Sequence, residues 1–175
     1  MTYNNYGLSK LIGERYSELL GGLCFKIWNC YGFEDPNIYG EKMHAIGDFI
    51  CKAIKGKDID MLTDGEEIRQ YTYTKDFAKA LYQVGIHYDE ILEKQNIIDI
   101  SRFEWTKLID IANLIKDIVF EKTGIDVKVI PSDKKATLQK IVNHPEKDIL
   151  KYWKPEIKLK DGLSEIVDKY LNTNF

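Results

Sequence analysis

The chain has 175 residues, is 44% hydrophobic and 30% charged, and carries a formal net charge of -3. This composition allows one buried core, or one domain and a half, and excludes a disordered or fibrous chain. The slight acidic excess argues against a general nucleic-acid binder. No apolar run approaches the roughly 18 to 20 residues that cross a bilayer, and no secretory signal is visible. We therefore expect a cytoplasmic protein without membrane or nucleic-acid partners.

The first third of the chain predicts a helix, a strand and a second helix. Apolar residues recur at three- and four-residue steps over 6–20, and Gly21-Gly22 ends that helix. The apolar run 23–28 predicts a buried strand, and a loop follows over 30–39 with the turn sequence Asp35-Pro36-Asn37. A second amphipathic pattern predicts a helix over 43–54.

The remainder continues to alternate between strands and helices, which predicts an α/β fold. Expected strands are 59–62, 70–74, 97–100 and 127–130; expected helices are 76–86, 106–122, a short one after Pro145, and one near 163–171. No Gly-x-Gly-x-x-Gly motif occurs in these 175 residues, so no loop for the phosphates of a dinucleotide is predicted.

The cysteines and histidines predict neither a disulfide framework nor a metal site. Cys24, Cys30 and Cys51 include no Cys-x-x-Cys pair, and the three histidines are scattered without the spacing of zinc ligands. We therefore expect three reduced thiols and no bound metal.

Tyr6 and Lys10 stand four residues apart near the start of the first helix, and therefore lie on one face. An ammonium group favours the phenolate form of a nearby tyrosine, and such a pair can act as an acid or base at neutral pH. The spacing alone carries little information, because Tyr71 and Lys75 share it and Tyr71 lies inside a predicted strand. The alternative is a solvent-facing pair of little consequence.

Several ordered motifs resemble the second half of an extended short-chain dehydrogenase/reductase, and more narrowly the NAD-dependent nucleotide-sugar epimerases and dehydratases. Tyr6-Gly7-Leu8-Ser9-Lys10 resembles Tyr-Gly-x-Ser-Lys, and Asn29-Cys30-Tyr31-Gly32 resembles Asn-x-Tyr-Gly. The segment 64–76 is similar to the family's glycine turn and Arg-Asp-Phe motif, with Gln70 in place of the Asp. Segments 97–112 and 153–163 resemble its later strand, capped helix and C-terminal signature.

This resemblance implies a partial Rossmann-like unit, namely the last helix and strand of its parallel sheet over 1–32. A small α/β substrate-binding domain over 33–175 would follow. It implies NAD or NADP as cofactor, a nucleotide sugar as substrate, and either a homodimer or an N-terminal half as partner. Tyr6 and Lys10 would be catalytic and would contact the cofactor, whereas Asn29 and Arg69 would bind the substrate. The alternatives are a turn-forming role for Asn29 and a surface ion pair of Arg69 with Glu66 or Glu67.

The chain also departs from the family pattern. The glycine-rich loop, most of the sheet and a catalytic Ser or Thr have no counterpart here, and the later Arg-Pro-Gly appears only as Pro131-Ser132-Asp133. Lys134 and Lys135 are candidates to replace that arginine, although a solvated pair is the simpler interpretation. We therefore expect an isolated chain without turnover. The alternative is a non-catalytic, truncated module that binds a nucleotide sugar or associates with a partner.

Overall fold

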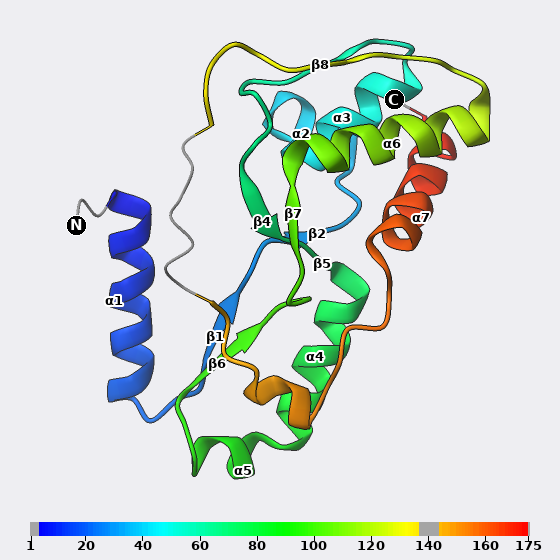
Figure 1. Cartoon of the computed structure of the whole chain (residues 1–175). Helices are drawn as coiled ribbons and strands as arrows, with labels where there is room; N and C mark the ends of the chain where they lie inside the picture. Colours follow the sequence, from blue (N-terminus) through cyan, green and yellow to red (C-terminus); the bar gives the residue numbers. More distant parts are fainter. Residues whose placement is uncertain (1–3, 137–143, 175) are drawn as a thin grey trace.

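The computed structural model describes residues 4–136 and 144–174. Figure 1 shows α3 (Ala45–Ile54) and α6 (Leu108–Thr123) side by side at one end of the molecule, with α7 (Leu159–Leu171) beside them. The other end holds α4 (Thr74–Ile86) and α5 (Tyr88–Leu92), and α1 (Asn5–Leu19) stands at the edge.

In the part of the chain that the structure describes, the strands form four two-stranded ribbons that run between these helices. Three are parallel, as alternating strands and helices predict, and the β4–β7 ribbon is antiparallel. The pairs are β1 (Cys24–Ile27) with β6 (Ile97–Ile100), β2 (Cys30–Tyr31) with β5 (Thr72–Tyr73), β3 (Ile59–Asp60) with β8 (Val129–Ile130), and β4 (Ile68–Gln70) with β7 (Trp105–Lys107). The expected α/β class is confirmed.

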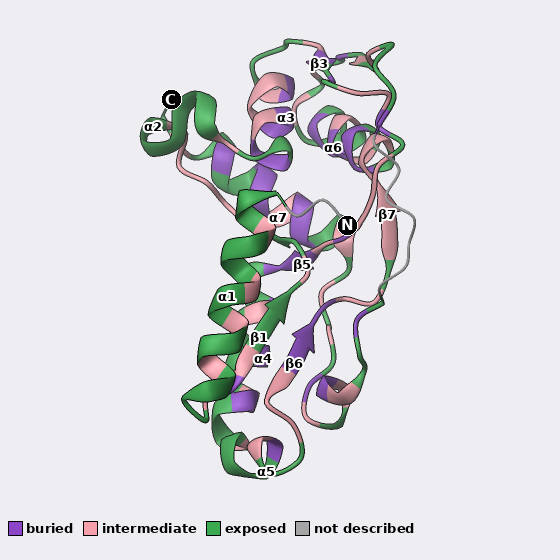
Figure 2. Ribbon diagram, turned by 90° about the vertical axis from the view of Figure 1, so that its left-hand side faces the viewer, coloured by how far each residue is buried: buried purple, intermediate pink, exposed green. Residues whose placement is uncertain are grey.

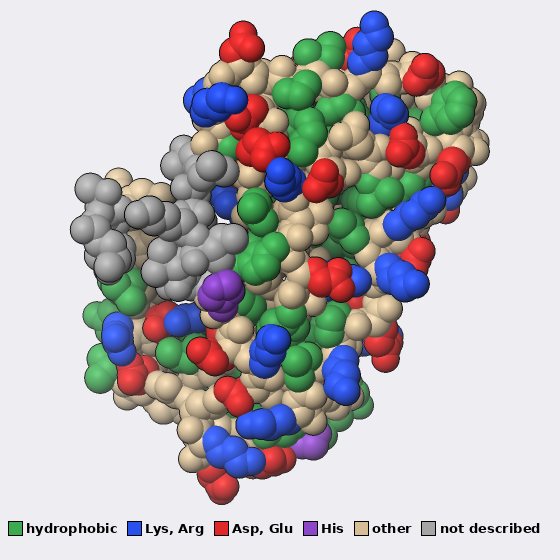
Figure 3. Space-filling view, in the orientation of Figure 1, with side chains coloured by type: hydrophobic (Ala, Val, Ile, Leu, Met, Phe, Trp, Pro, Cys, Tyr) green, Lys and Arg blue, Asp and Glu red, His purple; other side chains and the backbone are tan. Residues whose placement is uncertain are grey.

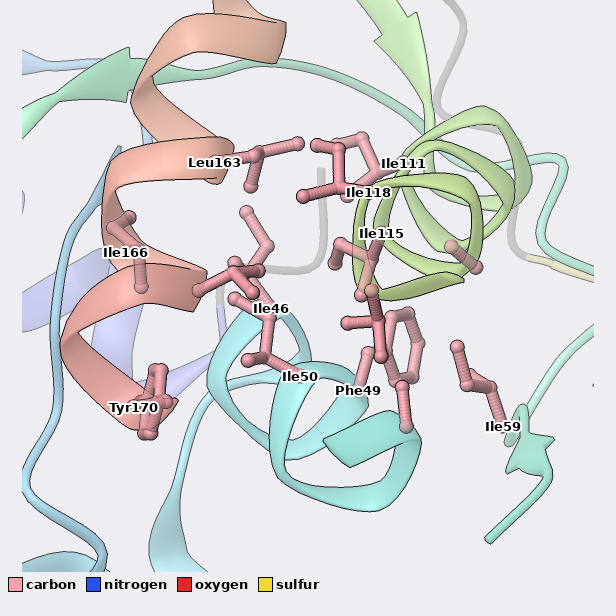
Figure 4. Packing of buried hydrophobic residues seen from close by; sticks show 14 of the residues in the cluster. Ile46, Phe49, Ile50, Ile59, Ile111, Ile115, Ile118, Leu163, Ile166 and Tyr170 are labelled. Atoms are coloured by element: carbon pink, nitrogen blue, oxygen red, sulfur yellow. The ribbon is translucent and has the colours of Figure 1, made fainter. Parts of the chain in front are cut away.

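The larger core lies where α3, α6 and α7 pack together. Ile50 of α3, Ile115 of α6 and Ile166 of α7 are each completely buried, and Figure 4 shows their side chains converging. Apolar residues at helical spacing supply these contacts, because one stripe of each helix faces its neighbours. This core forms one wall of the cavity described below.

A smaller core lies between α4, β6 and the 3-10 helix η2 (Asp148–Lys151). It contains Ala80 and Val84 of α4, Ile98 and Ile100 of β6, and Trp153 after η2. Trp153 is buried in this smaller core. Asp76 begins this region: one of its carboxylate oxygens accepts the backbone N–H groups of Glu156 and Ile157, which fixes the C-terminal segment against α4.

Several predicted boundaries were wrong. The expected loop 30–39 contains β2 and a one-turn helix, α2 (Pro36–Tyr39), which is followed by the 3-10 helix η1 (Gly40–Lys42). Thr106 does not begin a helix, because it pairs with Arg69 in the β4–β7 ribbon, and α6 starts two residues later. Helix α5 was not predicted, and α7 begins at Leu159.

The prediction of a buried strand over 23–28 was also wrong. Only Leu23 of this run is buried, and Phe25 and Ile27 are exposed. The cause is that, among the described residues, β1 pairs with β6 alone, whereas a central strand of a parallel sheet is covered on both faces. Helix α1 lies against β1 but has no buried residue, and most of its surface is green in Figure 2.

The outer surface carries interspersed charges. In Figure 3, blue and red side chains alternate across the face shown, without a large region of one sign. No helix among residues 4–136 and 144–174 is long and apolar enough to cross a membrane.

Candidate functional site

A cavity of about 550 Å³ lies where β2, the start of α3 and the β4 strand meet the N-terminal turn of α1. Its volume is in the range typical of small-molecule sites. Tyr6, Asn29 and Arg69 all line it, although they come from three separate parts of the sequence. Three of the four residues proposed from the sequence therefore share one cavity.

Asn29 reaches the cavity through an unusual backbone conformation. Its φ angle is 34°, in the left-handed region that asparagine tolerates better than most residues. Its carbonyl accepts the backbone N–H of Thr72 at 2.9 Å, which joins the end of β1 to β5. The residue thus lines the cavity, and its backbone joins the two parallel ribbons, whereas no hydrogen bond of a turn through its side-chain amide is seen among the described residues.

Arg69 lies in β4 and is partly buried. Its Nη1 donates to the carbonyl of Ile68 at 3.0 Å, and it forms no ion pair with any described residue. The alternative pairing with Glu66 is not formed, because Glu66 binds Lys107 at 2.7 Å. The guanidinium group is thus left available at the cavity wall.

Tyr71 follows β4 and lines the cavity beside Arg69. Burial raises the pKa of the Tyr71 phenol to about 12, and the positive charge of Arg69 opposes that shift. Tyr71 therefore stays neutral near pH 7. Lys75, four residues after Tyr71, forms an ion pair with Glu165 at 2.6 Å. Tyr71 and Lys75 therefore do not form an acid–base pair.

Tyr6 and Lys10 are neighbours on the exposed side of α1. The Lys10 ammonium lies over the Tyr6 ring, 5.3 Å from its centroid. At an exposed site such a contact contributes on the order of 0.5–1 kcal/mol. Tyr6 lines the cavity but Lys10 does not.

Two further residues of the cavity were not recognised from the sequence. Glu34 follows β2 and His44 precedes α3, and they hydrogen-bond to each other through both backbone and side chain. No motif marked them, because Glu34 lies in the predicted loop 30–39 and His44, ten residues later, at the start of the predicted helix 43–54.

The lysines proposed to replace an arginine lie elsewhere. Lys135 pairs with Asp64 at 3.3 Å, and neither it nor Lys134 is among the cavity-lining residues. The solvated-pair interpretation therefore agrees better with the structure.

A second hollow, of about 530 Å³, lies on the outer side of α4. It is lined by Lys79, Tyr82, Lys151, Trp153 and Lys154, among others, and by none of the residues proposed from the sequence. Within the described part of the chain, no three His, Cys, Asp or Glu side chains are grouped to hold a metal ion.

Comparison with known proteins decides the family. Residues 2–100 match the model of the NAD dependent epimerase/dehydratase family. The chain belongs to this family. The resemblance to an extended short-chain dehydrogenase/reductase is thereby confirmed.

Individual relatives agree with this assignment. A putative UDP-glucose 4-epimerase of Methanocaldococcus jannaschii is 29% identical over 97% of this chain and 54% of its own length. A dTDP-glucose 4,6-dehydratase of Escherichia coli is 27% identical over 88% of this chain and 43% of its own length.

A solved structure supports the fold. The crystal structure of UDP-glucose 4-epimerase with UDP-glucose from Thermotoga maritima superposes with a TM-score of 0.75, at 22% identity, over 98% of this chain and 55% of that one. This likeness confirms the expected Rossmann-like α/β architecture. The chain spans about half the length of the relatives that it matches.

Proposed function

We propose that this chain is the nucleotide-sugar-binding portion of an NAD(P)-dependent epimerase or dehydratase. The observation that supports this most strongly is the convergence of Tyr6, Asn29 and Arg69 on one cavity. The family assignment supplies the reaction class, and the cavity supplies a place of suitable volume for the substrate. We also propose a division into a Rossmann-like segment, 1–32, and a substrate-binding domain, 33–175.

Each residue takes a role that its chemistry allows. Arg69 would bind a phosphate oxygen of the substrate, since a guanidinium can donate two parallel hydrogen bonds to such a group. The amide of Asn29 would orient the sugar, because it can both donate and accept. Tyr6 would exchange a proton with a sugar hydroxyl, and Lys10 would favour its phenolate form.

The chain's own residues do not fit a complete NAD or NADP molecule. Tyr6 and Lys10 could contact one end of it, but its pyrophosphate requires a glycine-rich turn before a helix. The glycines with positive φ in the described residues lie after α1, α2, α3 and α6 and in the turn before β4, and none forms that arrangement. We therefore derive no step through the cofactor.

Isothermal titration with UDP-glucose tests the proposal directly. We expect the chain to bind UDP-glucose with a stoichiometry of about one, and Arg69→Gln to weaken binding roughly tenfold or more, because a charge-assisted hydrogen bond contributes about 1.5–3 kcal/mol. Lys134→Gln, outside the cavity, is the matched control and should bind as the parent chain does. Absence of UDP-glucose binding would contradict the proposal, and micromolar NAD binding would contradict the missing cofactor site.

A second function, association with a partner, is favoured by the uncovered surface of α1. Ile12, Tyr16 and Leu19 repeat at helical spacing, and all three are exposed. Such a stripe on a folded protein marks an interaction surface. The partner would be a second copy of this chain or a polypeptide that supplies the N-terminal half of the family fold.

Sedimentation velocity distinguishes these partners. Self-association that disappears in Ile12→Glu/Leu19→Glu would support a second copy as the partner. A chain that stays monomeric at high concentration would contradict it and leave the N-terminal half as the partner. Leu62→Glu, at an exposed position outside α1, is the control and should not alter association.

A further inference from the structure

The pair formed by Glu34 and His44 has a geometry that fixes the orientation of the imidazole. The Glu34 carboxylate accepts the backbone N–H of His44 at 2.8 Å through one oxygen and contacts the ring nitrogen Nδ1 through the other. Because a carboxylate can only accept, Nδ1 carries the proton. The second ring nitrogen, Nε2, has no hydrogen-bond partner within residues 4–136 and 144–174, and the His44 side chain is 86% exposed.

Glu34 is itself held rigidly by the larger core. Its backbone N–H donates to the Tyr170 hydroxyl at 3.2 Å, and that hydroxyl donates to the Glu34 carbonyl at 2.8 Å. The Glu34 side chain is only 18% exposed. A carboxylate anchored from behind by α7 can therefore orient a residue that is otherwise open to solvent.

Gly47 makes the close approach of α3 to this carboxylate possible. A Cβ atom at position 47 would lie 2.9 Å from Glu34 Oε2 and 2.9 Å from the Tyr170 hydroxyl. Only glycine lets the first turn of α3 come so near. Ala45, Ile46 and Gly47 of the same turn line the cavity. This is the N-terminal end of α3, where backbone N–H groups without helical partners favour the binding of an anion.

The charges around the cavity explain what the pair would do. Apart from its tyrosines and Cys30, the ionisable residues that line it are Glu34, Glu67, Arg69 and His44, so with a neutral imidazole two carboxylates oppose one guanidinium. Protonation of His44 removes this negative excess and turns Nε2 into a second donor. The other titratable side chains that line the cavity are Tyr6, Cys30, Tyr31 and Tyr71. Cys51 and Tyr170 interact electrostatically with Glu34, Asp48 with Cys51, and Asp35 with Tyr170.

We propose that Glu34 is a positioning residue that aims the imidazole of His44 into the cavity, where its Nε2, once protonated, donates a hydrogen bond to the diphosphate of a nucleotide sugar. This inference rests on the proposed function and adds a specific contact to it. Protonation would give the ring a positive charge and a second donor, so ligand binding should strengthen on acidification.

The test is titration of the chain with UDP-glucose at about pH 6 and about pH 8. UDP-glucose is a suitable probe because, unlike a phosphate monoester that titrates near pH 6, its diphosphate is a diester of constant charge. We expect binding about tenfold tighter at the lower pH, since only the protonated ring has an N–H at Nε2 to donate, and a hydrogen bond to a charged group contributes about 1.5–3 kcal/mol. In His44→Gln and Glu34→Gln the ratio should fall toward one.

His87→Gln is the matched control, because His87 also pairs with a glutamate, Glu90, but lies outside the cavity. It should keep the tenfold ratio. Parent-like affinity and pH dependence in His44→Gln, or equal affinity of the parent chain at both pH values, would overturn the inference while leaving the proposed function intact. Absence of binding at both pH values would overturn both.

Discussion

Helices α3 and α1 are both apolar along one side, but their surroundings differ completely. Ile50 of α3 has no exposed surface and packs against α6 and α7, whereas Ile12 of α1 is 47% exposed and no residue of its helix is buried. The region around α3 therefore has a complete hydrophobic core, whereas α1 presents an apolar surface to solvent. The cavity lies between them, with α3 and β4 on one side and Tyr6 of α1 on the other.

This contrast bears on which part of the reaction the chain can support. The residues proposed to bind substrate, Asn29 and Arg69, are held by strand pairing. Tyr6 is carried on a helix whose only substantial contact within the described residues is with β1. We therefore expect substrate binding to depend on the packed region, and catalysis to require whatever covers α1.

The largest expected effect on stability comes from truncating a side chain in the larger core. Ile50→Ala should lower the free energy of unfolding by about 2–5 kcal/mol, because it leaves a cavity among α3, α6 and α7. The matched change in α1, Ile12→Ala, should change it by less than about 0.5 kcal/mol, as surface substitutions usually do. Urea unfolding followed by circular dichroism measures both, and equal losses would contradict the contrast.

A smaller loss is expected where α7 approaches β2. A Cβ at Gly162 would overlap the Tyr31 hydroxyl, so Gly162→Ala should destabilise the fold by about 1–3 kcal/mol despite the better helix propensity of alanine. Gly85→Ala in α4 is the control, because no described atom lies within 4 Å of the position that an added Cβ would take. It should be neutral or stabilising, and a stable Gly162→Ala would show that this contact is not close-packed.

The most gradual effect is expected in alkaline solution. Burial raises the pKa of Tyr71 and Tyr73 to about 12, so the unfolded state, with tyrosine pKa near 10, ionises first. Stability from these groups is therefore present below about pH 10 and falls by on the order of 1 kcal/mol per pH unit between about 10 and 12.

Tyr71→Phe sharpens this prediction, because it removes one of the titrating phenols from the packed region. Its unfolding free energy should fall less steeply above pH 10, whereas Tyr16→Phe, on exposed α1, should follow the parent chain. Identical alkaline slopes in all three proteins would show that Tyr71 does not stabilise the fold in its neutral form.

Much of the fold could be predicted because local patterns determine it. The helices α3 and α6 follow from amphipathic spacing, and β6 was predicted with its observed bounds, 97–100. The β4–β7 ribbon could not be foreseen, since Arg69 and Thr106 are far apart in sequence and their pairing is a tertiary effect. The exposure of β1 could not be predicted either, because an apolar run in the sequence does not indicate whether neighbouring strands and helices cover the strand.

Only those residues of the site that belong to recognisable sequence motifs could be predicted. Tyr6, Asn29 and Arg69 belong to recognisable motifs, and the structure places them around one cavity. Glu34 and His44 belong to no motif that we recognised, and their pairing depends on α7 holding Glu34 from behind. Contacts of that kind arise from packing and have no local signature.

The central claim is that the cavity between β2, β4 and α3 binds a nucleotide sugar. Its most direct test is a backbone amide NMR titration of the chain with UDP-glucose. We predict that the shifts concentrate at Asn29, Gly47 and Arg69 and leave Gln83 and Lys151, in the second hollow, unchanged. Shifts centred on α4 and η2, or none at saturating UDP-glucose, would contradict it.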